Sequence, residues 1–149
     1  MNLIIGCDDA AYDMKEILKE HLEKKGHVIF DVGVNDKTTS IYPDIADKLC
    51  CKIISGRYEK GFLLCGTGIG MAITANKIPG IRAAVGHDLF SVERSIKSNN
   101  CQVLCFGARI IAPQYAVMLA DRWLECEFDG GNSAYKVQRI MEIEDEYHR

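Results

Sequence analysis

Five short apolar runs alternate along the chain with longer segments of helical periodicity. The runs are residues 2–7, 28–32, 62–65, 81–85 and 103–106. The helical segments are residues 11–25, 45–54, 71–77, 89–97, 112–125 and 134–147. Short buried runs separated by helices are typical of a parallel sheet covered on both faces. The sequence therefore predicts an α/β fold, a three-layer α/β/α sandwich around a five-stranded, parallel, Rossmann-like sheet.

Size and composition narrow the class of protein. The 149 residues match one ordinary domain, so residues 1–149 are predicted to form a single domain. A net charge of -3 argues against a nucleic-acid partner, because phosphate backbones select basic faces. No apolar run reaches the length of a membrane span and no signal-peptide pattern is present, so we expect no membrane association and a cytoplasmic location. The seven cysteines lack C-x-x-C spacing and are expected to be reduced thiols.

The most informative chemical feature is a glycine-rich turn, Cys65-Gly66-Thr67-Gly68-Ile69-Gly70, between a strand and a helix. Backbone N–H groups in such a turn can bind an anion. The spacing is neither the dinucleotide-binding G-x-G-x-x-G, since Met71 stands at the third glycine position, nor a P-loop. A tight turn with a buried cysteine and no chemistry is the alternative interpretation.

Reactive side chains follow several strands. Ligands of parallel sheets bind beyond the carboxyl ends of the strands. The segments at these ends are Cys7-Asp8-Asp9, Cys65-Gly66-Thr67, Gly86-His87-Asp88 and Gly107-Ala108-Arg109. We expect them to converge at one edge of the sheet. A thiol there can act as a nucleophile, or as a base that forms an enediolate held by backbone donors.

Several motifs resemble those of the ribose-5-phosphate isomerase B family, which also contains galactose-6-phosphate isomerase subunits. They are Gly6-Cys7-Asp8, Tyr42-Pro43, Cys65 to Gly70, Ala75-Asn76-Lys77, Gly80-Ile81-Arg82-Ala83 and Phe106-Gly107-Ala108-Arg109, and they span nearly the whole chain in order. The resemblance implies reversible aldose–ketose isomerisation of a sugar phosphate without metal or organic cofactor. It also implies a homodimer or a dimer of dimers with shared active sites, and the helix over 134–147 is expected at the dimer interface.

The resemblance assigns roles to individual residues. Cys65 matches the base that moves a proton between C1 and C2, and Thr67 matches its helper hydroxyl. Backbone groups from Gly66 to Gly70, including Gly68 and Ile69, match the cradle of the enediolate. Asp8 and Tyr42 match positions at the substrate. Asn99 and Arg109 match ligands that reach over from the other subunit.

Other positions depart from the family pattern. Asp9 stands where a histidine is common, and Ser98 replaces the histidine that opens the sugar ring. Asn132 and Lys136 stand where arginines are common, so Lys136 is expected to serve the phosphate as a point charge. His87 is a candidate for the missing acid, and a turn residue without chemistry is its alternative interpretation.

These departures bear on the substrate. Ribose 5-phosphate closes into a ring through O4, whereas a tetrose 4-phosphate cannot, because its O4 carries the phosphoryl group. The segments 87–94 and 98–102 also resemble a subgroup that includes D-erythrulose-4-phosphate isomerases. The main prediction is an isomerase of the ribose 5-phosphate type. The alternatives are an isomerase of a tetrose or another sugar phosphate, an inactive metabolite-binding relative and, with least support, a flavodoxin-like nucleotide-binding domain.

Overall fold

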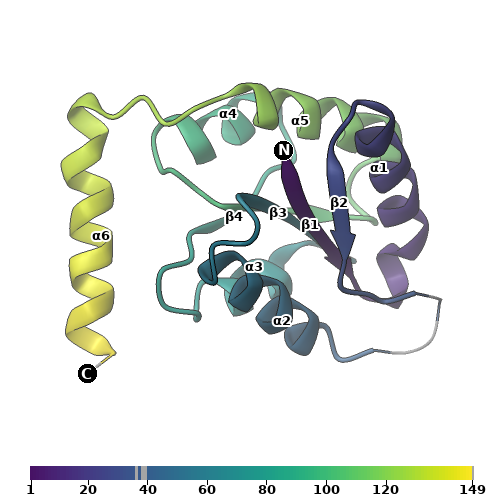
Figure 1. Ribbon diagram of the computed structural model, residues 1–149, viewed down its shortest axis with the longest axis horizontal. Helices are drawn as coiled ribbons and strands as arrows, with labels where there is room; N and C mark the ends of the chain where they lie inside the picture. The colour runs from purple at the N-terminus through teal and green to yellow at the C-terminus, as the bar shows by residue number, and fades with distance from the viewer. Residues whose placement is uncertain (36, 38–39, 149) are drawn as a thin grey trace.

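The computed structural model describes residues 1–35, 37 and 40–148. A central sheet lies between two layers of helices, and one further helix stands at the side of this body (Figure 1). In chain order the elements are β1 (Asn2–Cys7), η1 (Asp9–Ala11), α1 (Tyr12–Lys24), β2 (Val28–Asp31), α2 (Tyr42–Ile54), β3 (Lys60–Cys65), α3 (Ile69–Ala75), β4 (Ala83–Val85), α4 (Leu89–Lys97), β5 (Val103–Gly107), α5 (Pro113–Glu125), η2 (Gly131–Ser133) and α6 (Ala134–Tyr147).

The sheet has the strand order β2-β1-β3-β5-β4, and every neighbouring pair is parallel. This confirms the predicted five-stranded parallel sheet. Cys7 pairs with Leu64, and Cys65 pairs with Gly107. The three strands β1, β3 and β5 therefore end side by side, at the edge where such sheets bind ligands.

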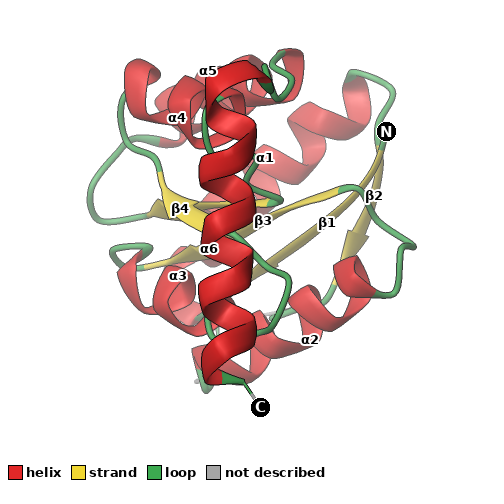
Figure 2. Cartoon of the chain, turned by 90° about the vertical axis from the view of Figure 1, so that its left-hand side faces the viewer, coloured by secondary structure: helices red, strands yellow, loops and turns green. Residues whose placement is uncertain are grey.

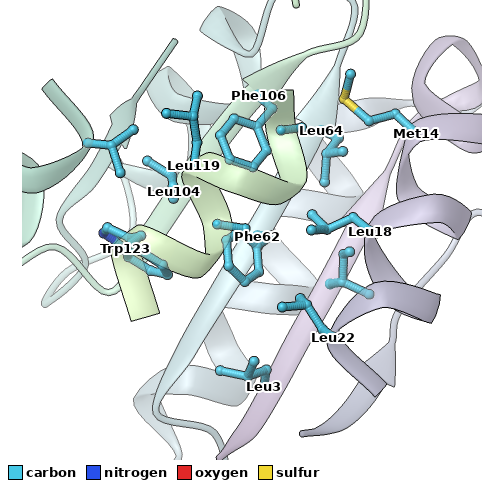
Figure 3. Close-up of a cluster of buried hydrophobic side chains, with 14 of the residues drawn as sticks. Leu3, Met14, Leu18, Leu22, Phe62, Leu64, Leu104, Phe106, Leu119 and Trp123 are labelled. Carbon is cyan, nitrogen blue, oxygen red and sulfur yellow. The ribbon is translucent and has the colours of Figure 1, made fainter. Parts of the chain in front are cut away.

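Two apolar layers hold the helices on the sheet. Helices α1, α4 and α5 cover one face, and α2 and α3 cover the other, as Figure 2 shows from the side. In the first layer the Phe62 ring meets Trp123 edge-on, with 5.2 Å between ring centroids, and lies near Phe106 (Figure 3). The Trp123 indole N–H donates to Ser95 Oγ at 3.1 Å, which satisfies the one polar atom of that ring.

Several element boundaries differ from the sequence prediction by one to three residues, and two of these differences have a clear physical reason. Strand β4 begins at Ala83 instead of residue 81, because the Arg82 N–H donates to the Gln102 side chain at 2.8 Å instead of a backbone ladder. Helix α2 begins at Tyr42, three residues early, since Pro43 is well suited to the first turn of a helix.

Helix α6 stands beyond the β4 edge of the sheet and is largely exposed (Figure 1). Its only buried residue is Val137. Two hydrogen bonds link it to the body: the Gly80 N–H donates to Glu144 at 2.9 Å, and an Arg82 N–H donates to Met141 Sδ at 3.1 Å. An apolar helix face with so little cover within its own chain is consistent with the expected role of α6 at a subunit interface.

A buried lysine anchors the end of β2. Lys15 on α1 is fully buried, and its ammonium group donates to the Val34 carbonyl and lies 2.8 Å from Asp31. Burial alone would raise the pKa of Asp31, but hydrogen bonds from Lys15 and the Gly33 N–H outweigh it and hold that pKa below its usual value. Both charges are therefore compensated inside the protein.

We expect Lys15→Met to lower the free energy of unfolding by about 3 kcal/mol, because it leaves the half-buried Asp31 carboxylate without its main partner. Lys24→Met on the same helix breaks an exposed pair with Glu20 and should cost less than about 0.5 kcal/mol. Urea unfolding of both variants measures the difference. Equal, small losses would show that the buried pair contributes no more than a surface one.

Candidate active site

Cys65 is the last residue of β3 and lies at the start of the glycine-rich turn. Its sulfur accepts a hydrogen bond from the Gly68 N–H at 3.1 Å. Gly68 adopts a left-handed conformation, with φ of 77°, which allows the turn to fold back over the thiol. The turn thus places a backbone N–H directly against this sulfur.

Three other buried thiols, on β1, α2 and β5, are in a different environment. Burial raises the pKa of Cys7 to about 11 and that of Cys50 to about 12. Burial raises the pKa of Cys105 on β5, which pairs with Leu63 on β3, well above its usual value. These thiols stay protonated and serve as small apolar side chains.

A cavity of about 210 Å³ opens over the Cys65 turn. Its lining comes from four segments of the chain: Asp8, Tyr42, Cys65, Gly66, Thr67, Gly70 and Arg109. Among the described residues, no acceptor takes the N–H groups of Thr67 and Gly70. The cavity therefore combines a thiol, a hydroxyl, free backbone donors and both signs of charge.

The carboxylate and guanidinium groups of the cavity have distinct positions. Asp8 caps the short helix η1, accepting the Ala11 N–H at 3.1 Å. Burial raises the pKa of Asp8, and the nearby Arg109 opposes that shift. Arg109 lies over Gly66, where an added Cβ would meet its guanidinium at 3.2 Å. Asp8 suits hydroxyl groups of a substrate, and Arg109 suits an anionic group.

The residues at the end of β5 hold the Cys65 turn in place through backbone hydrogen bonds. The Ala108 N–H donates to the Cys65 carbonyl at 2.9 Å, and the Arg109 N–H donates to the Gly66 carbonyl at 3.0 Å. Gly107 packs so tightly that a Cβ there would lie 2.7 Å from three backbone atoms of Thr67. Two strands thus fix the position of Cys65 and Thr67.

One expectation about Arg109 is wrong. Its family counterpart is expected to reach over from another subunit, but this chain places Arg109 in the cavity of its own Cys65. The reason is the strand order, which puts β5 directly beside β3. The Gly68 N–H donates to the Cys65 sulfur, and the Ile69 N–H donates to the Thr67 hydroxyl. Asp9 is the first residue of η1 and does not line the cavity.

Ser98 and Asn99 lie away from Cys65 in the same chain. Helix α4 starts after the carboxyl end of β4 and runs back to the opposite edge of the sheet, where β5 begins. The Ser98 hydroxyl accepts an N–H from Arg94 at 3.1 Å, and the Asn99 amide donates to the Arg94 carbonyl at 2.9 Å. Sequence reasoning missed Arg94, although its four-residue spacing from Ser98 on one helix could have revealed the contact.

The other predicted groups are also apart from the cavity. Asn132 belongs to η2 and Lys136 to the first turn of α6, where its ammonium group lies 5.9 Å from the centre of the Tyr135 ring. His87 follows β4, and its Nε2 accepts the Gly107 N–H at 2.8 Å. In this arrangement Nε2 carries no proton to donate, and the role of His87 as an acid stays a prediction.

Comparison with known proteins places this geometry in a family. Residues 3–140 match the family model described as Ribose/Galactose Isomerase. The chain belongs to this family. The ribose/galactose isomerase relatives include the ribose-5-P isomerase B of Listeria innocua, 45% identical over 97% of both chains. The D-erythrulose-4-phosphate isomerase of Pectobacterium atrosepticum is 46% identical over 94% of this chain and 93% of its own.

A solved relative has the same fold. The ribose-5-phosphate isomerase B of Clostridium thermocellum is 37% identical and superposes with a TM-score of 0.97 over 99% of both chains. The predicted family, its isomerase class and the Rossmann-like fold are thereby confirmed. Within the described residues, no helix is long and apolar enough to cross a membrane, and no group of three or more acidic, histidine or cysteine side chains is arranged to hold a metal ion.

Proposed function

We propose that this isomerase interconverts an aldose phosphate and its ketose, with ribose 5-phosphate and ribulose 5-phosphate as the main substrate pair. The observation that carries the proposal is the Cys65 thiol, hydrogen-bonded by the Gly68 N–H at 3.1 Å and facing a cavity with further free N–H groups. A base next to donors is what proton transfer beside a carbonyl requires.

The reaction is a transfer of one proton between neighbouring carbons. The Cys65 thiolate takes a proton from C2 of the open-chain aldose, and the electron pair of that bond moves into a cis-enediolate. The N–H groups of Thr67 and Gly70 stabilise the oxygen that gains charge. The Thr67 hydroxyl relays the proton between the two oxygens, and the Cys65 thiol returns its proton to C1. No oxidant or reductant is consumed.

Other groups hold the substrate. Asp8 binds sugar hydroxyls, and Tyr42 borders the opposite wall of the cavity. Arg109, which belongs to the same chain as Cys65, holds an anionic group of the substrate. Asn99, Asn132 and Lys136 complete the site from a second copy of the chain, because they lie outside the cavity of their own Cys65. The whole chain works as one isomerase domain.

A dimer built through α6 fits this arrangement. Tyr135 and Tyr147 on that helix are 63% and 84% exposed, and Ile140 and Ile143 are also exposed. Large apolar side chains gathered on one weakly attached helix favour burial against another subunit. The proposed assembly is a homodimer or a dimer of dimers with shared active sites.

A second substrate, D-erythrulose 4-phosphate, is favoured by the environment of Ser98. Its hydroxyl already accepts from Arg94, and a hydroxyl is a much weaker acid than an imidazolium. A tetrose 4-phosphate needs no ring opening and so no acid at that position. The relative from Pectobacterium atrosepticum carries the name of this activity.

Turnover of the two ketose phosphates by the purified protein tests the proposal. We expect isomerisation of ribulose 5-phosphate, and erythrulose 4-phosphate is assayed separately as the second candidate. Turnover confined to erythrulose 4-phosphate would replace the main substrate with the tetrose. Turnover of neither would contradict both proposals and favour a six-carbon substrate or a metabolite-binding role.

A further inference from the structure

Strand β4 ends at Val85, opposite Cys105, two residues before β5 ends at Gly107, and a side chain takes the place of the missing backbone. The Gly86 N–H donates to the Cys105 carbonyl at 3.2 Å, so Cys105 directs its backbone groups toward β4. Alternate residues of a strand face the same neighbour, so Gly107 directs its N–H toward β4 as well. There the acceptor is His87 Nε2, at 2.8 Å.

This hydrogen bond lies directly behind the Cys65 turn. Gly107 pairs with Cys65 across the sheet, and the next two residues donate to the carbonyls of Cys65 and Gly66. A Cβ on Gly68 would lie 3.3 Å from the Gly107 nitrogen, so the turn rests on this peptide. A shift of Gly107 must therefore move the thiol, the donor to its sulfur, or both.

The bond requires a neutral imidazole. Nε2 accepts a hydrogen bond from the Gly107 N–H, so the ring carries its single proton on Nδ1. Burial lowers the pKa of His87, against the opposing charge of Asp88, and this keeps the ring neutral. An imidazolium would present a second donor to the Gly107 N–H and break the contact.

We propose that His87 is a positioning residue that holds the β5 end against the Cys65 turn through the Gly107 N–H. The proposal rests on the proposed function of that turn. It differs from the acid role, because Nε2 of His87 acts as a hydrogen-bond acceptor. It also explains why a polar side chain lies beside Gly107, because β4 offers no backbone carbonyl to the Gly107 N–H there.

Two variants separate positioning from simple loss of a side chain. His87→Gln keeps an acceptor oxygen that can reach the Gly107 N–H, whereas His87→Leu keeps the bulk and removes the acceptor. We expect kcat to fall about tenfold or more in His87→Leu, with a smaller change in KM, because a misplaced base slows the chemical step more than binding. His87→Gln should keep kcat within about threefold of the wild type. Equal losses in both variants, or no loss in His87→Leu, would overturn the proposal.

A measurement without substrate keeps this inference separate from the proposed function. Long-range ¹H–¹⁵N spectra of the wild-type protein at neutral pH should show His87 protonated on Nδ1 and bare on Nε2. The Gly107 amide should exchange with solvent faster in His87→Leu than in His87→Gln. A proton on Nε2 would overturn the inference. Absence of isomerase turnover in a protein that shows the Nδ1–H form would contradict the proposed function and leave the hydrogen bond established.

Discussion

Cys65→Ala is expected to lower kcat for ribulose 5-phosphate by about a thousandfold or more, because it removes the thiol that we propose takes the proton from carbon. Substrate binding should change far less, since Asp8, Tyr42 and Arg109 remain. Steady-state kinetics of the purified variant measures both. Retention of more than about a tenth of the wild-type kcat would contradict the assignment of Cys65 as the base.

Cys105→Ala is the matched control for this variant. Cys105 is fully buried on the neighbouring strand, and burial keeps it protonated. Its removal creates a small cavity and lowers the free energy of unfolding by about 1 to 2 kcal/mol. Its kcat should stay near the wild-type value. A loss of activity as large as that of Cys65→Ala would mean that packing, and not the chemistry of one thiol, explains both results.

Gly107→Ala is expected to have the second largest effect, with kcat falling about a hundredfold and the free energy of unfolding falling as well. The new Cβ would lie 2.7 Å from the Cα, C and O atoms of Thr67. Backbone atoms cannot rotate away as a side chain can, so the turn itself must move. Kinetics and urea unfolding of the variant report the two effects.

Gly61→Ala provides a comparison in the same sheet. Its Cβ would lie 2.9 Å from Leu49 Cδ2 and 3.0 Å from Ile4 Cγ2, which are ends of side chains. Gly61 precedes Cys65 by four residues on β3, which places it roughly 13 Å from the thiol. We expect this variant to lose stability but keep its kcat. If Gly107→Ala also kept its kcat, close packing of Gly107 would not control the geometry of the site.

The sequence predicted the layers of this fold well, because each strand is a short apolar run and each helix has a clear apolar face. The sequence predicted less about which strands lie next to each other in the sheet. The parallel sheet was evident from the alternation, but the strand order that sets β5 beside β3 depends on packing between distant segments. That order explains why Arg109 lines the cavity of its own chain.

Part of the candidate site could be grouped from the sequence. Asp8, Tyr42, Cys65, Thr67 and Arg109 were named from the sequence, and all five line one cavity. The contact of His87 could not be predicted, because it depends on a partner from another element, the Gly107 N–H. A histidine in a turn has the same sequence signal whether its ring donates or accepts.

The most direct test of the central claim follows deuterium at carbon. In D₂O, a base that removes a proton from substrate exchanges it with solvent, so wild-type protein should place deuterium on C1 of ribulose 5-phosphate and on C2 of ribose 5-phosphate, as seen by NMR. Cys65→Ala should leave those positions unlabelled over the same time. Labelling by Cys65→Ala at the wild-type rate would show that another group removes the proton and would contradict the account.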